Sequence, residues 1–298
     1  MKRIYWRRAV AALLLAAAPL AAGCAASEAE GAGRLTVAVS IVPEEALARA
    51  VCGELADIVT IIPPGYSPEN YEPSPNEMVR VSRAAVYFTI GVPAESAGIL
   101  PDLPDSVRVV SLSEAAAGVY PERMFESGGR DPHVWLSPRR VRVMTDTIAA
   151  IMGEIDPDNA AVYRSNADEF IDELDALDRE IAGYFEGIAD PVFVVSHPAY
   201  GYLADDYGLR MESLEQDGKE ATPRHMESLI DMARECGIRA IFTQAECDAN
   251  LPDVFAREIG GEKIVLSPLS ADYLNNMRLM ARAIADGCGA GTHREAEQ

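Results

Sequence analysis

The feature that most constrains the fold of this sequence is a regular alternation of short apolar runs with helical patterns. Eight runs rich in β-branched residues occur, at 34–41, 57–62, 85–90, 107–112, 191–196, 209–214, 239–244 and 263–267. Most are continuously apolar, as strands covered on both faces are, and their alternation with helices indicates parallel sheets. Four runs lie on each side of a long helical segment. We therefore predict an α/β fold of two Rossmann-like lobes, each with a four-stranded parallel sheet.

The segment between the two sets of runs predicts one long helix over 156–188. Its apolar or small residues recur at steps of four and three, at Tyr163, Ala167, Phe170, Leu174, Leu177, Ile181 and Tyr184. That spacing makes one helical stripe, and about 30 residues at 1.5 Å each give a rod of roughly 45 Å. A coiled-coil seam is the alternative, but the stripe covers only four heptads. We predict a stiff helix that joins an N-terminal lobe (34–155) to a C-terminal lobe (189–290), followed by a tail (291–298).

The N-terminus has the pattern of an export signal. "MKRIYWRR" supplies four cations, and a 14-residue apolar run follows that is too short for a membrane-spanning helix. The run ends in "LAAGC", which resembles a bacterial lipoprotein processing site. We expect residues 1–24 to be the signal through a lipidated Cys24, and 25–33 to be a tether. The protein would then be anchored on the outer face of the cytoplasmic membrane, or be periplasmic. An ordinary signal with an incidental Cys24 is the alternative.

The net charge limits which classes of partner the protein can bind, and the cysteine count bears on its disulfides. The formal net charge of −21 becomes −25 without the four signal cations, which argues against nucleic acid as a partner. No basic amphipathic helix suggests binding to anionic lipid. Beyond Cys24 there are four cysteines: Cys52, Cys236, Cys247 and Cys288. An even number in an exported chain favours disulfides, although the sequence does not fix their pairing, and the spacings match no zinc finger.

Two stiff loops present candidate ligands just before helices. "IIPPGYSPENYEPSPNEM" has five prolines that hold Glu69 and Glu72 ahead of a helix capped by Ser74. In "DPHVWLSP", His133 stands four residues before a second cap-plus-proline pair at Ser137. The same pairing at Asp156 and Thr222 predicts two further helix starts.

The other histidines differ in context. His197 ends the strand run "PVFVVSH", and ligands bind at the carboxyl ends of strands in open α/β sheets. His225 falls in a predicted first helical turn and His293 in the polar tail, so we expect both at the surface. Taken alone, His133 and His197 would more often be structural histidines than ligands.

Five segments together resemble one family. They are "GYSPENYEPSP", "DPHVWLSP", "VVSHPAYGYLADDYGL", "KEATPRHMESLI" and "LSPLSADYLNNMRLM". They occur in the order and at about the spacing of the metal-binding receptors of ABC importers for zinc and manganese. The resemblance covers essentially the whole mature chain. It implies two lobes joined by a long backbone helix, one divalent ion in the cleft between them, a monomer, and delivery of the ion to a permease.

The resemblance also implies a ligand set. The second family histidine matches His133, and the third position, histidine in zinc-type members and usually glutamate in manganese-type members, matches His197. The first position, normally histidine, is Glu69 here, and the fourth, often aspartate, is Ser267. The histidine-rich loop of zinc-type members is missing. Family zinc receptors often tie the C-terminal helix to the second lobe by a disulfide, for which Cys288 would pair with Cys236 or Cys247.

Chemically, Glu69, His133 and His197 form a His2Glu set that suits zinc and leaves a fourth position open. Ser267, Glu246 or water could fill it. Gln244, Glu246, Cys247 and Asp248 follow a predicted strand end and could approach the cleft. We predict a zinc-binding receptor, with manganese or iron(II) as the alternative cargo because a carboxylate favours harder ions. A zinc hydrolase with Glu72 as base, and a metal-free receptor or adhesin, are the alternatives from other classes.

Overall fold

The structure is a computed structural model that describes residues 34–216, 221–245 and 250–289. The chain divides into two units, Met1–Arg34 and Leu35–Gln298, and both lobes belong to the second. The predicted signal and tether, the tail, and His293 lie outside the described residues. Within the described part of the chain, no helix is both long and apolar enough to cross a membrane.

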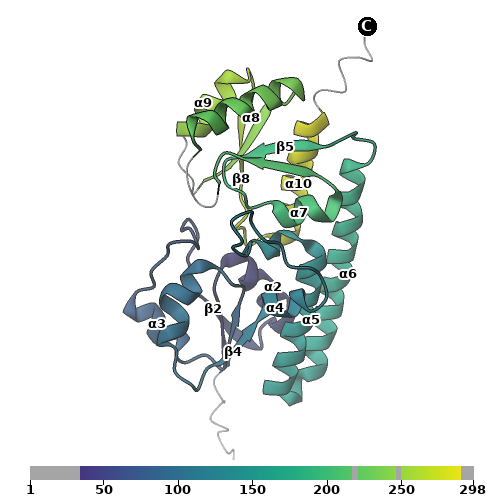
Figure 1. Cartoon of the computed structure of the whole chain (residues 1–298). Coiled ribbons are helices and arrows are strands. Elements are labelled where there is room, and N and C mark those ends of the chain that lie inside the picture. Colours follow the sequence, from purple (N-terminus) through teal and green to yellow (C-terminus); the bar gives the residue numbers. More distant parts are fainter. Residues whose placement is uncertain (1–33, 217–220, 246–249, 290–298) are drawn as a thin grey trace, which may run out of the picture. The chain divides into compact units, whose positions relative to one another are not determined.

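The strands form two parallel sheets, as predicted (Figure 1). The first sheet has the order β2-β1-β3-β4 and the second has β6-β5-β7-β8, so the two lobes share one topology. The strands are β1 (Leu35–Val39), β2 (Ala56–Thr60), β3 (Val86–Thr89), β4 (Arg108–Ser111), β5 (Val192–Val195), β6 (Arg210–Ser213), β7 (Ala240–Gln244) and β8 (Glu262–Leu266). All the paired strands are parallel; in the first sheet, for example, Val37 pairs with both Ile58 and Val86. Loops that follow the carboxyl ends of β2, β5, β6 and β8 build the site.

Helices cover the sheets and connect the strands. They are α2 (Val42–Cys52), α3 (Pro75–Val81), α4 (Leu112–Ala117), α5 (Pro138–Ile155), α6 (Ala160–Phe185), α7 (Gly201–Tyr207), α8 (Pro223–Glu235), α9 (Asn250–Glu258) and α10 (Tyr273–Gly289). Short turns of π or 3-10 helix occupy Glu95–Ile99, Leu100–Asp102, Val134–Leu136 and Pro157–Asn159.

Three of the four predicted caps form. Ser74, Ser137 and Thr222 each accept a hydrogen bond from the backbone N–H three residues later. At Asp156 the carboxylate instead accepts from Asn159 Nδ2 and the Tyr163 hydroxyl. A 3-10 turn therefore precedes α6, and the long helix begins later than its sequence pattern indicates.

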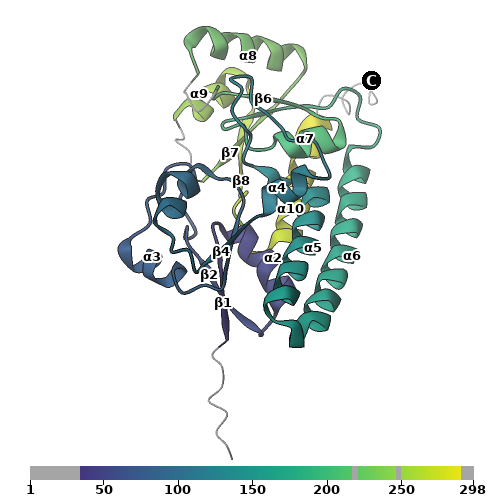
Figure 2. The ribbon, with the colours of Figure 1, turned by 60° about the horizontal axis from the view of Figure 1, so that its bottom comes forward.

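The connecting helix α6 is 26 residues long, which is about 39 Å. Its buried face is formed by Tyr163, Ala167, Ile171, Leu174, Leu177, Ile181 and Phe185. Phe170 and Tyr184 of the predicted stripe are half-buried and pack against the edge of the core, because the fully buried stripe steps by four to Ile171 and again to Phe185. The helix contacts α2 and α5 of the first lobe and α10 of the second, and Figure 2 shows α5 and α6 side by side.

One apolar core continues from lobe to lobe. Val37 and Phe88 of the first sheet belong to the same cluster of buried residues as Leu174 of α6 and Phe242 of the second sheet. A separate cluster under α8 and α9 includes Phe255. Burial of apolar surface therefore stabilises the two lobes together and fixes how their strand ends face each other.

Of the two partners that the family resemblance implies for Cys288, Cys236 does not pair with it. Cys52, Cys236 and Cys288 are free thiols, and Cys247 lies outside the described residues. Cys236 caps the exposed end of α8, whereas the Cys288 thiol donates to Val192 O at 3.3 Å, where α10 meets β5. Burial raises the pKa of Cys288 to about 11, so it stays a neutral thiol at neutral pH.

A buried acidic cluster lies beyond the carboxyl ends of β1 and β3. Glu44 Oε2 accepts from Ser40 N at 2.9 Å, and Glu95 accepts from the Ser40 hydroxyl and from Ile90 N. Tyr87 OH lies 2.7 Å from Ser40 Oγ. Burial raises the pKa of Glu44 well above its usual value, and the nearby Glu95 carboxylate adds to the effect; burial raises the pKa of Glu95 too. The pair therefore retains a proton at a pH where an exposed glutamate would be ionised.

Candidate metal centre

The proline-rich loop after β2 carries Glu69 into the cleft. Pro68 is buried, and its carbonyl accepts a hydrogen bond from Ala94 N at 3.1 Å. Glu69 N donates to Ser67 Oγ at 3.3 Å. The loop is thus fixed on the N-terminal side of Glu69, while the Glu69 side chain keeps 42% of its surface exposed.

His133 is held by its own lobe. Asp131 Oδ1 accepts from both the backbone N–H of His133, at 3.0 Å, and the ring Nδ1, at 2.8 Å. Arg123 Nε forms an ion pair with Asp131 Oδ2 at 3.2 Å, and its Nη1 reaches Asp205 of α7. The ring of His133 also packs against Trp135, whose indole donates to Pro268 O of the other lobe at 2.9 Å. These contacts fix the ring and direct its Nε2 into the cleft.

His197 follows β5 and is buried at the mouth of the second sheet. Its Nδ1 lies 2.7 Å from Glu215 Oε2, and Glu215 follows the neighbouring strand β6. A carboxylate therefore holds the Nδ1 of each histidine, which leaves Nε2 free to face an ion.

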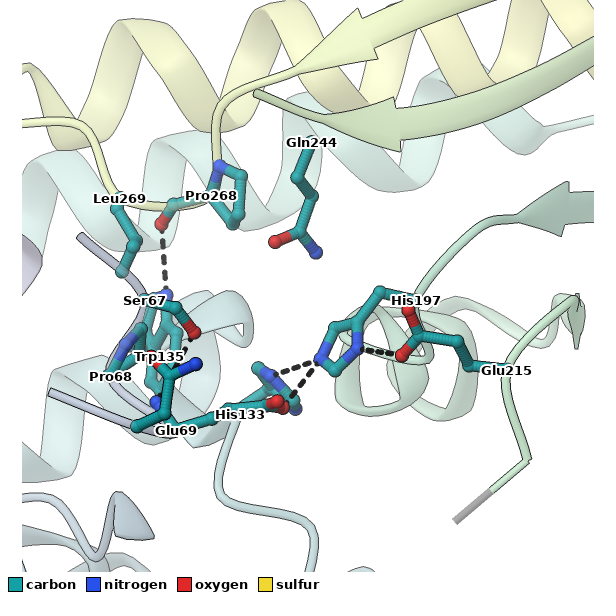
Figure 3. A pocket seen from close by; sticks show the side chains of 11 residues that line it. Ser67, Pro68, Glu69, His133, Trp135, His197, Glu215, Gln244, Pro268 and Leu269 are labelled. Carbon is teal, nitrogen blue, oxygen red and sulfur yellow. Dashed lines mark hydrogen bonds and ion pairs between the residues drawn. The ribbon is translucent and has the colours of Figure 1, made fainter. Parts of the chain in front are cut away.

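The two Nε2 atoms and the Glu69 carboxylate converge. The Nε2 atoms of His133 and His197 are 3.2 Å apart, and His197 Nε2 is 3.1 Å from Glu69 Oε1. The three ligand atoms all lie within 4.8 Å of one another. Two nitrogens bound to one tetrahedral zinc would be about 3.3 Å apart. Figure 3 shows the three side chains meeting in a pocket that is also lined by Glu215, Gln244, Trp135, Pro268 and Leu269.

The site holds a proton where an ion would bind. Burial lowers the pKa of His197, but hydrogen bonds to Glu215 and Glu69, together with their charges, outweigh it and raise the pKa to about 9. The hydrogen bond with His197 lowers the pKa of Glu69 despite partial burial. His197 is thus an imidazolium between two carboxylates, and a cation that binds its Nε2 replaces that proton.

The remaining sequence candidates lie elsewhere. Ser267 is exposed, its carbonyl accepts from Asn276 at 2.6 Å, and its neighbours Pro268 and Leu269 line the pocket in its place. Glu72 is exposed and does not line the pocket. Glu246 is outside the described residues. His225 is half-buried rather than at the surface, because its Nε2 lies 2.9 Å from Ser213 O.

Sequence reasoning did not identify Asp131 and Glu215 as supports of the two histidines. The signal for Asp131 is its position two residues before His133, from which a carboxylate can reach both the backbone N–H and the ring. Glu215 follows the carboxyl end of β6, next to the strand that ends at His197. The rule that polar residues gather at strand ends would have found it.

Comparison with known proteins places the chain in a family. The sequence profile described as "ZnuA: Zinc-uptake complex component A periplasmic" matches residues 37–287. The solved structure "Crystal structure of ZnuA" is 30% identical, superposes with a TM-score of 0.80, and covers 85% of this chain and 99% of its own. The manganese-binding lipoprotein MntA of Halalkalibacterium halodurans is 26% identical over 257 residues, 83% of this chain and 84% of the relative.

A further relative, the manganese ABC transporter substrate-binding lipoprotein PsaA of Streptococcus mitis, is 26% identical over 264 residues, 81% of this chain and 85% of the relative. The fold and the three-residue cluster agree with the class of two-lobed metal receptors. The chain belongs to the family of the zinc-uptake complex component A, the metal-binding substrate-binding proteins of ABC transporters.

Proposed function

We propose that this protein captures one zinc ion with Glu69, His133 and His197 and presents it to the permease of an ABC importer. The observation that supports this most is the convergence of three ligand atoms, within 4.8 Å, from three separate loops. Two imidazoles and one carboxylate are a recognised zinc set, and their separations suit a single tetrahedral ion.

Zinc is the preferred cargo and manganese the alternative. Imidazole nitrogen favours zinc over manganese at equal availability, whereas the Glu69 carboxylate favours harder ions. The relatives include a protein named for zinc uptake and others named for manganese. A calorimetric competition decides the order: zinc should displace manganese, and manganese binding that resists zinc would reverse the assignment.

The ligand assignment is tested by stabilisation. With zinc at about 100 times its dissociation constant, binding stabilises the folded protein by about 2.7 kcal/mol. We expect His133→Ala and His197→Ala each to abolish the zinc-dependent rise in melting temperature. His225→Ala is the matched control, because His225 lies outside the site, and it should retain the full rise. If all three variants respond to zinc like the parent protein, the ion binds elsewhere.

We place the receptor outside the cytoplasm, tethered by a lipid on Cys24, and acting as a monomer. The support is the signal pattern and the lipoprotein names of the relatives. Retention in the membrane fraction after a high-salt wash is the expected result, and full release would exclude the anchor. We further propose a receptor rather than an enzyme, since Glu72, the base that a zinc hydrolase would need, does not line the pocket.

A further inference from the structure

Gln244 is a polar side chain of the pocket that the ligand set does not use. It is the last residue of β7, and only 9% of its surface is exposed. It lines the same cavity of about 210 Å³ as Glu69, His133 and His197. Figure 3 shows its carboxamide directed from the second lobe into the space beside His197.

The amide nitrogen of Gln244 has no hydrogen-bond acceptor among the described residues. Two acceptors that line the same pocket bind other donors and are not reached by Gln244 Nε2. Pro268 O accepts from the Trp135 indole, and Glu215 Oε2 is bound to His197 Nδ1. A buried N–H donor without an acceptor is unfavourable, and such groups are uncommon in folded proteins. The arrangement therefore points to an acceptor that arrives with the cargo.

The chemistry of a bound ion identifies that acceptor. Three protein ligands leave the fourth position of a tetrahedral zinc open. An N–H cannot face the cation itself, and amide oxygens are not among the usual protein ligands of zinc. A water-derived oxygen on the ion would fill the open coordination position and would also accept a hydrogen bond from the Gln244 amide. The three ligands alone leave a +1 charge on the loaded site, and the Glu215 and Asp131 carboxylates behind the two histidines compensate it, so the oxygen can be water or hydroxide.

We propose that Gln244 Nε2 donates a hydrogen bond to a water-derived ligand that completes the coordination of the bound ion. The inference rests on the proposed function. Gln244 is then a positioning residue rather than a metal ligand. A bound cation lowers the pKa of its water, and a donor aimed at the resulting hydroxide lowers it further.

The test uses the full chain with zinc and with cobalt(II) as probes. Gln244→Leu and Gln244→Met remove the donor with two different shapes. Thr243→Val is the matched control, because Thr243 is the neighbouring buried polar residue on β7 and does not line the pocket. Its hydroxyl accepts from Ser196 and donates to the backbone carbonyl of Gln244, so it does not touch the Gln244 carboxamide. Zinc affinity is measured by chelator competition, and the cobalt visible spectrum is followed against pH.

We expect both Gln244 variants to bind zinc about tenfold more weakly, while their metal-free melting temperatures do not fall. The pH midpoint of the cobalt spectral change should rise by about one unit, because the hydroxide form loses its donor. Thr243→Val should leave both the affinity and the midpoint unchanged.

Three results would overturn the inference. One is a parent cobalt spectrum that does not change with pH. Another is a midpoint that is the same in the Gln244 variants as in the parent protein. A third is a loss of metal-free stability as large as the loss of affinity, which indicates a purely structural role. If the parent chain binds neither zinc nor cobalt, the proposed function itself is wrong. If the parent chain and the Gln244 variants bind zinc with the same affinity, only this inference is wrong.

Discussion

The two histidines of the site come from opposite lobes, and their supports differ in stiffness. Asp131 is 0% exposed, holds His133 by backbone and ring together, and is itself paired with Arg123. Glu215 is 30% exposed and holds His197 by the ring alone. The first half of the site is therefore positioned before an ion arrives, whereas the second half can adjust to it.

The largest effect expected from this difference is on zinc affinity. Asp131→Asn should weaken binding about 10- to 100-fold, as loss of an outer-shell partner of a metal ligand does. The loss of zinc affinity in Glu215→Gln should be at or below the lower end of that range, because solvent can more easily replace a partly exposed carboxylate. Chelator competition measures both variants, with Glu212→Gln on the same strand as the control. Equal losses for the two carboxylates would show that the two halves are equally rigid.

The two lobes also differ in the polar groups that surround the residue after their first strand, which is β1 in one lobe and β5 in the other. Ser40 after β1 contacts Glu95 and Tyr87, close to the buried Glu44. The side chain of Ser196 after β5 instead donates to a hydroxyl, Thr243 Oγ1, at 3.0 Å. The two lobes share one topology, but the first buries acids where the second buries neutral groups.

This contrast predicts a pH dependence of stability from the buried acids of the first lobe, in addition to the one that His197 contributes. The folded pKa of Glu44 is raised, so its stabilising contribution is complete below the unfolded pKa and is lost as pH rises through the folded pKa. Each unit of pKa difference corresponds to about 1.4 kcal/mol. Between pH 5 and pH 8, the free energy of unfolding should decline less in Glu44→Gln than in the parent protein, as measured by urea denaturation. Thr243→Val should keep the parental slope, and a parental slope in Glu44→Gln would refute the assignment.

The smallest expected effect concerns the link between the lobes at α7. Asp205 pairs with Arg123 at 2.8 Å but is 51% exposed, and exposed ion pairs contribute about 0–1 kcal/mol. Asp205→Asn should thus lower the free energy of unfolding by less than 1 kcal/mol and leave zinc affinity within about threefold. A large loss of affinity would mean that His133 depends on the second lobe through Arg123, which would remove the distinction between the two halves.

Most of the fold follows from local patterns in the sequence. Apolar runs bounded by helices were sufficient for the two sheets. The central strands β3, β5 and β7 are buried throughout, whereas the edge strands β2, β4, β6 and β8 keep exposed positions. The 3.6-residue period defined α6, but it did not show that Phe170 lies at the edge of the buried face, because a stripe of steps of four and three drifts around the helix. Whether Phe170 or Ile171 faces the core depends on α5 and α10, which the helix sequence alone does not contain.

The meeting of three ligand residues at one point could not be predicted from local sequence patterns in the way that the sheets were. Glu69, His133 and His197 were chosen from loop context and from resemblance to a family, and the structure brings their ligand atoms together. Asp131 and Glu215 were missed because a carboxylate that orients a ring looks like any surface acid in the sequence. The pairing of Cys288 with Cys236 failed because it came from the family alone, without a geometric constraint.

The continuous core along α6 has a consequence for how a transporter distinguishes a loaded receptor from an empty one. Separating the lobes would expose apolar side chains that both share, so the arrival of cargo should change their arrangement little. A divalent cation nevertheless alters the local charge and displaces the His197 proton. We expect the permease to sense the electrostatic state of the cleft mouth, around the exposed Glu69, rather than a change in lobe angle.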